Sequence, residues 1–451
     1  MFCYEYYCRA GYGEPLREFL LEATALLYYI ELNGIKVFDS ASVDTSILIF
    51  IKTTPDSTHT FDFAHPKDYD TKANVPLQEY ITPQSLLQSS LTKESFIFQD
   101  STNAALKAKI EAIGTPLKEW DISIYRGILT GYNEAFIIDS TKRDEILRNC
   151  VSENERQRTS ELIKPILRGR DIKRYSYEWA GLWIIFISWH FPNTQNPKSM
   201  EENEADLAEQ YPSLYNHLLY HKEKLSKRNK DETGIRYEWY CLQRYGANYY
   251  QEFEKEKIVW NPVSGEYFFT HIKETMYFNN SLFMMTIGNT SLQGVSETNN
   301  EAMKSHQSHE VPPLEASSGV WGVKGGIRGA TSQFKPPCPP LKKMNGKLLY
   351  ILGLMNSTLY KWLITQMTNL VETGKYAYGA KDKIEQLPIP KITESNKPLC
   401  DEIIKCVDKI LESKAKDSTL DTKELESKID SLVYKLYNLT NDEIGIIDSK
   451  T

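Results

Sequence analysis

The sequence predicts an α/β protein of two or three domains, and three observations lead to that fold class. With 451 residues the chain is long enough to bury more than one core. Close to its start, a stretch with helical spacing of apolar residues is followed by a short apolar run typical of a buried strand. Apolar residues in 396–441 recur only at helical spacing. The strands are therefore expected upstream of this helical tail.

The first element that we expect is a helix over residues 14–31, followed by a turn and a strand. Six apolar side chains of this stretch share one helical face: Leu16, Phe19, Leu20, Ala23, Leu27 and Ile30. Residues 46–51 form a largely apolar run, which predicts a strand buried on both faces. This order of elements is typical of the edge of an α/β domain, here residues 1–52. Residues 53–101 begin with a polar segment interrupted by proline, and we predict a linker or excursion loop.

The middle of the chain is predicted to mix helices and strands. A short helix over 102–114 leads to two strand-like runs, at 122–124 and 135–138, which are separated by turn signals. The pair Ser152–Glu155 has the spacing of a capping box and predicts that a helix follows it. The apolar run 183–187 predicts a further strand.

A dense group of cations lies between these strands. Five basic residues, opposed only by Asp171, fall within eleven positions: Lys164, Arg168, Arg170, Lys173 and Arg174. A basic loop between buried strands can contact phosphates, and a solvated charged loop is the alternative. Other candidates for phosphate contact lie in the turn after 122–124, at the end of an expected helix over 211–228, and on an expected exposed loop near residue 380. They are Arg126, Lys227, Arg228, Lys375, Tyr376, Lys381 and Lys383.

Composition excludes several classes of protein. With 53 basic and 60 acidic residues the net charge is −7, which argues against a coat-like nucleic-acid binder but is compatible with a local basic cleft. The seven cysteines include no C-x-x-C pair, so neither a disulfide framework nor a zinc ribbon is predicted, and a reducing cytoplasm is expected. We find no membrane-spanning segment and no signal-peptide pattern. His306 and His309 lie in a polar stretch without a carboxylate pattern, so no metal site is predicted.

The motifs of the middle region resemble one known family. The order RG-x-x-TG-x-NEAFIID, followed by IKPILRGRDIKRY, resembles the target-recognition region of Type IIG restriction–modification enzymes and their relatives, the TaqI-like C-terminal specificity domain. Similar matches follow at 257–264 and 277–288, and the match lapses over 289–343, where we predict a disordered insertion. The resemblance implies a mixed α/β target-recognition domain over 102–395. The two apolar helical faces of the tail predict a C-terminal helical hairpin over 396–451.

The same resemblance extends to the start of the chain. YCRAGYGEPLREFL and VFDSASVDTSILIFIK resemble the last helix and closing strands of the family's adenine-specific methyltransferase domain, which implies a partial Rossmann-like edge over residues 1–52. The glycine loop that holds S-adenosyl-L-methionine and the Asn-Pro-Pro-Tyr-type motif are absent from this sequence, since Asn261-Pro262 and Asn196-Pro197 continue without a second proline. We therefore expect this chain alone to bind no cofactor and to hold no catalytic residue, whereas the intact family uses S-adenosyl-L-methionine.

The function that the resemblance implies is sequence-specific binding of duplex DNA, which in the intact family positions an adenine for N6 methylation. Whether the chain is itself an enzyme stays open. One alternative is a polypeptide of a split adenine-specific DNA methyltransferase/endonuclease, active only with a separate partner that carries the catalytic motifs and the nuclease. Another alternative is a stand-alone specificity subunit, which the lack of an internal repeat disfavours.

Overall fold

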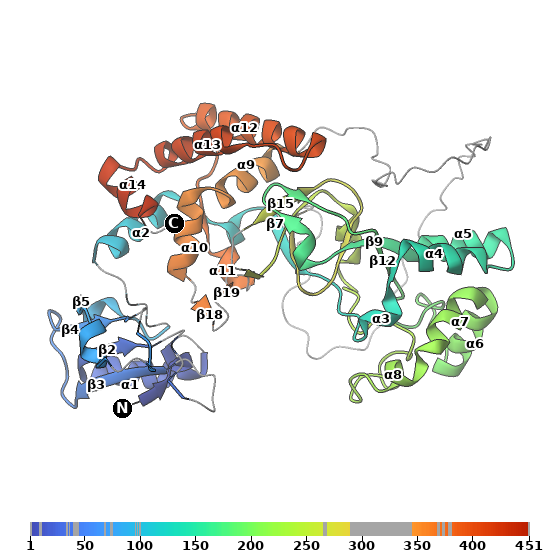
Figure 1. The fold of residues 1–451 in the computed structure, drawn as a ribbon, viewed down its shortest axis with the longest axis horizontal. Helices are drawn as coiled ribbons and strands as arrows, with labels where there is room; N and C mark the ends of the chain where they lie inside the picture. The colour runs from blue at the N-terminus through green and yellow to red at the C-terminus, as the bar shows by residue number, and fades with distance from the viewer. Residues whose placement is uncertain are drawn as a thin grey trace.

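The computed structural model describes most of the chain, and its parts have separate cores. The described residues are 2–8, 11–32, 35, 37–38, 45–66, 69–72, 75–94, 96, 98, 101–264, 268–288, 345–367, 370–371, 375–377 and 381–449. Buried apolar residues up to residue 98 form cores of their own, and those from residue 106 onward form two others. Figure 1 shows the N-terminal sheet as a body beside the larger remainder. The predicted insertion over 289–343, with His306 and His309, lies outside the described residues.

A five-stranded sheet with one helix forms the N-terminal part. In spatial order its strands are β1 (Phe2–Tyr4), β3 (Thr45–Ile51), β2 (Ala25–Glu31), β4 (Thr60–Ala64) and β5 (Gln84–Leu87). Strands β2 and β4 run parallel, and the other neighbouring pairs are antiparallel. The helix α1 (Glu14–Ala23) packs on one face, where Leu20 joins the buried cluster that contains Tyr29 and Phe61.

The helix predicted over residues 14–31 is wrong in its second half. Helix α1 ends at Ala23, and the hydroxyl of Thr24 donates to the carbonyl oxygen of Leu20 at 2.6 Å. Residues 25–31 form β2 instead, which pairs with β3 on one side and with β4 on the other. The apolar residues of this segment fit helical spacing as well as a central strand, and pairing with two neighbouring strands decides between them.

The linker predicted over residues 53–101 is also wrong, because this segment supplies β4 and β5 to the sheet. Phe61 of β4 and Leu86 of β5 are buried. The side chain of Gln88, only 2% exposed, accepts a hydrogen bond from the backbone N–H of Leu26 at 2.8 Å. A buried amide with a backbone partner fixes the segment to β2, and the segment is therefore part of the domain.

The strand predicted over residues 46–51 is present as β3, but it is not buried on both faces. Leu48 is buried, whereas Ile49 is 45% and Ile51 is 51% exposed. Tyr28, the neighbour of Ile49 on β2, is 38% exposed. Part of this sheet face is therefore an apolar surface open to solvent.

A four-stranded antiparallel sheet lies at the centre of the larger part. Its spatial order is β15 (Phe269–Ile272), β13 (Lys257–Trp260), β17 (Phe283–Ile287) and β7 (Ile122–Arg126). Every residue of β13 is buried. Ile258 and Trp260 belong to one core and Val259 to the other, because successive side chains of a strand point to opposite faces. The sheet is therefore packed on both faces.

A layer of helices packs on one face of this sheet. It contains α2 (Ser101–Ile113), α9 (Gly346–Met355), α10 (Thr358–Met367), α12 (Lys397–Lys416), α13 (Lys423–Leu436) and α14 (Asn441–Asp448). Helices α12 and α13 lie side by side in Figure 1, and Lys428 of α13 forms an ion pair with Glu402 of α12. A Cβ atom at Gly353 of α9 would lie 2.7 Å from a methyl carbon of Ile403, so glycine permits the close approach of α9 and α12.

The other face of the central sheet carries the recognition lobe, which is a second sheet with its helices. The second sheet has the order β16 (Tyr277–Phe278), β9 (Ile163–Leu167), β12 (Leu182–Ile185) and β8 (Ile137–Asp139). The helices are α3 (Asn133–Phe136), α4 (Ser140–Arg148), α5 (Glu153–Leu162), α6 (Met200–Gln210), α7 (Pro212–Tyr220) and α8 (Lys222–Ser226).

Three predictions for this lobe can be compared with the structure. The strand predicted over 183–187 is present as β12. The strand predicted over 135–138 begins as the one-turn helix α3 and continues as β8. The helix predicted over 211–228 is interrupted at His221, which separates α7 from α8.

Short elements complete the described chain. The strands are β6 (Thr115–Pro116) with β20 (Pro388–Ile389), β10 (Ile172–Lys173) with β11 (Ser176–Tyr177), and β14 (Val263–Ser264) with β19 (Lys375–Ala377) and β18 (Leu370–Val371). The short helices are η1 (Glu5–Cys8), η2 (Gly11–Gly13), η3 (Leu77–Tyr80), η4 (Gln88–Ser90), η5 (Leu117–Glu119), η6 (Gly169–Asp171), η7 (Tyr250–Glu254) and α11 (Lys381–Glu385). Among the described residues, no helix is long and apolar enough to cross a membrane.

The capping box predicted at Ser152 is only half formed. The hydroxyl of Ser152 accepts from the backbone N–H of Glu155 at 3.1 Å, as predicted. The Glu155 carboxylate, however, is buried and accepts from the N–H groups of Val151 at 2.6 Å and Ser213 at 2.9 Å. Because Ser213 lies in α7, the glutamate joins two helices of the recognition lobe instead of closing its own cap.

Candidate nucleic-acid interface

Three loop tips meet beside the central sheet, and we call them the loop cluster. They are the end of β7 at Arg126–Gly127, the one-turn helix η6 (Gly169–Asp171), and the turn Asn279–Ser281. The backbone N–H of Gly169 donates to the hydroxyl of Ser281 at 3.0 Å, and Nε of Arg126 donates to the carbonyl oxygen of Asn280 at 3.0 Å. Residues more than a hundred positions apart are thus held together by direct hydrogen bonds.

Glycine is required at two points of the loop cluster because the backbones approach closely. A Cβ atom at Gly127 would lie 2.0 Å from the carbonyl oxygen of Asn279. A Cβ atom at Gly169 would lie 2.6 Å from the side-chain nitrogen of Asn261, which follows β13. The turn of residues 279–281 is also fixed internally, since the Ser281 hydroxyl donates to Oδ1 of Asn279 at 2.5 Å. The cluster therefore has a defined shape before any ligand binds.

The side chains that the loop cluster presents are of the types that read DNA. Arg126 and Arg170 are exposed, and Asn280 is half-buried. Within the described part of the chain, Arg170 has no acidic partner within 4.0 Å. In the major groove arginine pairs bidentately with guanine and asparagine with adenine, and arginine also contacts phosphates. The loop cluster can therefore position DNA and read base edges.

Arg168, predicted to contact DNA, is engaged inside the protein, and we correct that prediction. Its guanidinium donates to both carboxylate oxygens of Asp171, with Nε–Oδ2 at 3.0 Å and Nη2–Oδ1 at 2.8 Å. Asp171 is only 5% exposed and also accepts from the backbone N–H of Arg168 at 2.8 Å. A bidentate pair to a buried carboxylate closes η6 and leaves the neighbouring Arg170 as the outward-facing cation.

Arg174 connects the recognition lobe to the C-terminal helices. Its Nε lies 3.0 Å from the Glu426 carboxylate of α13, and its Nη2 donates to the carbonyl oxygen of Asn356 at 2.5 Å.

Lys173 forms a solvent-exposed ion pair with Glu178 at 3.7 Å, which leaves its ammonium free to exchange partners. Lys164 is half-buried on β9 opposite Ile184 of β12. The basic run thus separates into internal and outward-facing members.

Arg228 is the second candidate that the structure removes. It is 7% exposed and donates to four carbonyl oxygens, those of Leu225 at 3.0 Å, Thr130 at 2.6 Å, Trp239 at 2.7 Å and Cys241 at 2.8 Å. Burial lowers the pKa of its guanidinium. This arginine holds loops of the recognition lobe together and offers nothing to a phosphate. Lys227, its exposed neighbour, pairs with Glu223 at 2.5 Å.

The candidates near residue 380 are only partly described. Lys375 and Tyr376 lie on β19, whose backbone pairs with β14 and β18, and their side chains lie outside the described part. Lys381 and Lys383 lie on helix α11 and not on the expected loop. Lys381 pairs with Glu385 one turn later at 3.5 Å. The described residues contain no group of three or more metal-ligating side chains placed to hold a metal ion.

Sequence reasoning missed Asn280 and Arg244 as candidates. Asn280 lies in the Asn-Asn-Ser turn between β16 and β17, and such a turn signal between two strands could have indicated an exposed tip. Arg244 is 69% exposed, and its backbone exchanges two hydrogen bonds with Leu129. It stands alone among aromatic residues, so no local pattern marks it.

Comparison with known proteins gives a family match over part of the chain and several similar solved structures, two of which are described below. Residues 164–304 match the TaqI-like C-terminal specificity domain. The matched range contains η6 and the turn 279–281, whereas Arg126 lies upstream of it. No curated protein matches the chain.

Two of the similar solved structures are of restriction–modification enzymes. One is the type IIG restriction endonuclease BpuSI, at 11% identity and a TM-score of 0.35, covering 97% of this chain and 47% of that one. The other is the Type IIL restriction–modification enzyme MmeI in complex with DNA, at 10% identity and a TM-score of 0.43. This match covers 94% of this chain and 44% of that one. The chain therefore spans less than half the length of either enzyme.

Proposed function

From the premise that residues 164–304 match the TaqI-like C-terminal specificity domain, we propose that the chain binds duplex DNA sequence-specifically, as the target-recognition portion of a Type IIG-like restriction–modification system. The observation that carries the proposal is the loop cluster. It gathers two exposed arginines, Arg126 and Arg170, around the asparagine of a fixed turn, Asn280. Arginine and asparagine are the side chains that discriminate guanine and adenine in the major groove.

The charge distribution supports contact with DNA at a small part of the protein surface and not over a broad one. The net charge of −7 repels the phosphate backbone at long range, so attraction must come from cations that are not neutralised within the protein. Arg170 is such a cation, whereas Arg168 and Arg228 are engaged internally. We expect few phosphate contacts, and therefore a modest dependence of affinity on salt.

We further propose that the N-terminal sheet is the edge of a methyltransferase-like domain whose remaining part lies on another segment or a separate polypeptide. The apolar surface that includes Leu27, Tyr28, Ile49 and Ile51 supports this, because an open apolar sheet face is typical of a surface that another element covers. It favours the split enzyme over the stand-alone specificity subunit. In the assembled protein, S-adenosyl-L-methionine would be bound by the other part, adenine N6 methylation would occur there, and the whole would act in the cytoplasm.

The experiment that tests DNA binding compares one candidate with a matched cation elsewhere. Affinity of the full chain for a fluorescent duplex of mixed sequence is measured at several salt concentrations. Arg170→Ala should lower the slope of log affinity against log salt by about one. The control is Lys397→Ala, because Lys397 is an exposed cation on α12, far along the chain, that pairs with Asp401 at 3.2 Å.

Three results would argue against the proposal. Wild-type protein that does not bind the duplex would refute DNA binding altogether. Equal slopes for wild type and Arg170→Ala would remove the loop cluster as the contact surface. A fall in slope for Lys397→Ala as large as that for Arg170→Ala would mean that the effect reports net charge and not a site.

A further inference from the structure

His190 lies on a loop that holds it in an unfavourable backbone conformation. Its φ is +62°, in the left-handed region that residues other than glycine rarely adopt. Histidine adopts this region more often than most residues, but glycine would fit it without strain. A strained residue persists only where surrounding contacts fix it, and such residues gather at functional sites. We therefore looked for the contacts that fix His190.

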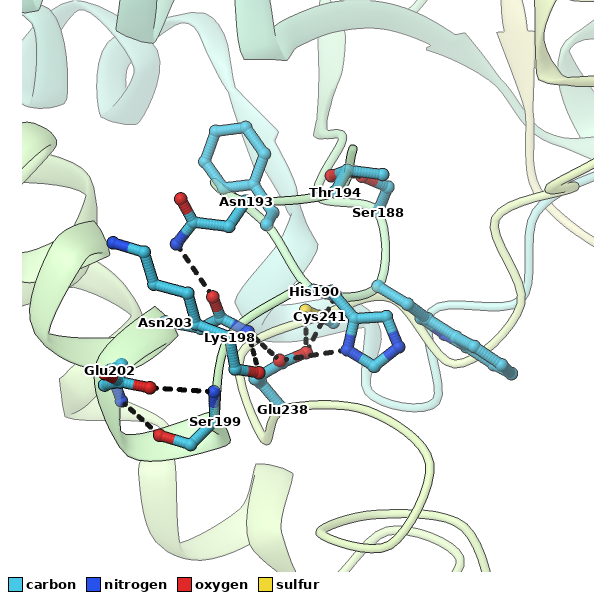
Figure 2. A network of polar contacts seen from close by, with 12 residues as sticks. Ser188, His190, Asn193, Thr194, Lys198, Ser199, Glu202, Asn203, Glu238 and Cys241 are labelled. Atoms are coloured by element: carbon cyan, nitrogen blue, oxygen red, sulfur yellow. Dashed lines mark hydrogen bonds and ion pairs between the residues drawn. The ribbon is translucent and has the colours of Figure 1, made fainter. Parts of the chain in front are cut away.

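A buried carboxylate beneath the loop fixes both the backbone and the ring of His190 (Figure 2). Glu238 is 2% exposed and accepts from the backbone N–H of His190 at 2.9 Å and from its Nδ1 at 3.2 Å. It also accepts from Nδ2 of Asn203 at 2.8 Å and from the thiol of Cys241 at 3.4 Å. Burial raises the pKa of that thiol, which keeps the proton in place to be donated. Four donors thus satisfy one buried carboxylate.

The loop has other anchors and does not depend on the imidazole ring for its shape. The indole N–H of Trp189 donates to the carbonyl oxygen of Leu242 at 2.8 Å. The hydroxyl of Tyr240 donates to the carbonyl oxygen of Phe191 at 2.8 Å. Figure 2 shows Asn193 reaching Asn203 from the other end of the loop, and that bond is 2.8 Å long. The ring of His190 is therefore presented by the loop and is not needed to build it.

The imidazole is available to an external partner. The His190 side chain is 35% exposed, whereas the Glu238 side chain beneath it is 1% exposed. Because Nδ1 faces the carboxylate, Nε2 is the ring nitrogen that a ligand can reach. A histidine that carries a proton on both ring nitrogens can donate from Nδ1 to the carboxylate and from Nε2 to an anion. The chemistry favours a phosphate oxygen as the partner.

One segment of chain connects His190 to the loop cluster. The backbone N–H of Leu242 donates to the carbonyl oxygen of Ile187, three residues before His190, at 3.0 Å. At the other end of the segment, the hydroxyl of Tyr249 donates to the carbonyl oxygen of Arg126 at 3.0 Å. The exposed Arg244 lies between these two points. One continuous segment therefore leads from Arg126 past Arg244, which lies 3.9 Å from Glu232, to the loop that carries His190.

We propose that His190 binds a backbone phosphate of the duplex, with Glu238 as its positioning residue. The proposal rests on the proposed function, because the phosphate belongs to the same DNA that the loop cluster reads. It adds a phosphate contact outside the loop cluster, and residues 242–249 connect this contact to the cluster. It also gives a reason for a histidine at a position where glycine would be less strained, because the ring, and not the backbone, is what the position supplies.

The decisive variant is His190→Gly, which relieves the backbone and removes the ring. The thermal midpoint of the protein should change little, because the relief of backbone strain and the loss of the ring's hydrogen bond to buried Glu238 act in opposite directions. At the same time the variant should lower the slope of log affinity against log salt for a mixed-sequence duplex by about one. The matched control is Asn438→Gly, an exposed position with φ +50° next to the C-terminal helices, which should leave the slope unchanged.

The role of Glu238 is tested by a double-mutant cycle. Glu238→Gln keeps the shape but removes the negative charge, and it should weaken DNA binding in the wild-type background. In the His190→Gly background it should weaken binding no further, because its effect acts through the ring. Additive losses would overturn the positioning role.

The outcomes separate this inference from the function on which it rests. If wild-type protein does not bind the duplex, both proposals fail. If wild-type protein binds and Arg170→Ala lowers the slope, but His190→Gly binds with the wild-type slope, only the phosphate contact of His190 is refuted. A lower thermal midpoint with an unchanged slope would identify the histidine as a structural residue.

Discussion

The stability of this protein should rise with pH above neutrality because of one buried lysine. Lys257 of β13 is completely buried, and its ammonium donates to the carbonyl oxygens of Phe253 at 2.8 Å, Lys255 at 2.7 Å and Glu274 at 2.9 Å. Burial lowers the pKa of Lys257 from 10.5 to about 7, while three nearby glutamates oppose this shift. The charged form is therefore less favourable in the folded protein than in the unfolded chain.

The sign and size of the effect follow from this difference in pKa. Between about pH 7 and 10.5 the unfolded chain binds the proton and the folded protein releases it, so the free energy of unfolding increases with pH. The slope is at most about 1.4 kcal/mol per pH unit. Over the whole window the gain is at most roughly 4 to 5 kcal/mol. Below pH 7 both states hold the proton, and this contribution becomes constant.

Urea unfolding between pH 7 and 9.5, followed by tryptophan fluorescence, measures the effect. The first tryptophan is Trp120, so the signal reports the larger part of the protein and not the N-terminal sheet. The control is Lys257→Met, which has a side chain of similar length without the charge. In this variant three carbonyl oxygens lose their hydrogen-bond donor, which lowers the free energy of unfolding by an amount that does not change with pH. Wild type should gain stability relative to the variant as pH rises, and parallel pH dependences would refute the reasoning.

Two further predictions concern arginines that the sequence suggested for DNA contact. Arg228→Ala should lower the free energy of unfolding by about 3 to 5 kcal/mol, because several buried carbonyl oxygens lose their donor, and Arg228→Lys should recover part of the loss. Arg168→Ala should cost about 1 to 3 kcal/mol in urea unfolding, since buried Asp171 loses its partner, but should leave the salt slope of DNA binding unchanged. Near-wild-type stability of Arg228→Ala, or a lower salt slope for Arg168→Ala, would contradict these assignments.

Local patterns predicted the elements whose signals are local. The strand at residues 46–51 and the N-cap at Ser152 were recognised because a short apolar run and a capping pair involve neighbours in sequence. The strand at 25–31 was missed because its apolar residues also fit a helix, and only pairing with β3 and β4 decides the outcome. Similarly, the alternation of residues 60–64 was hidden within a polar segment that looked like a linker.

The candidate site was harder to predict because long-range contacts determine which cations are available. Nothing near Arg228 in the sequence indicates that it will be enclosed by carbonyl oxygens from Thr130 and Trp239. The Arg126–Asn280 hydrogen bond joins residues 154 positions apart, so the loop cluster exists only in the folded protein. The basic run includes η6, one of the three parts of the loop cluster, but only the structure separates internal Arg168 from outward-facing Arg170.

Selection from a randomised duplex pool tests the central claim most directly. The full chain is incubated with the pool, bound duplexes are recovered over several rounds, and their sequences are compared with the input. We predict that one short motif is enriched, and that Asn280→Ala loses preference at a single position of that motif while the rest is kept, as expected for one lost base contact. Recovered sequences that match the input pool would contradict the account. A motif that Asn280→Ala leaves intact at every position would mean that the loop cluster does not read the bases.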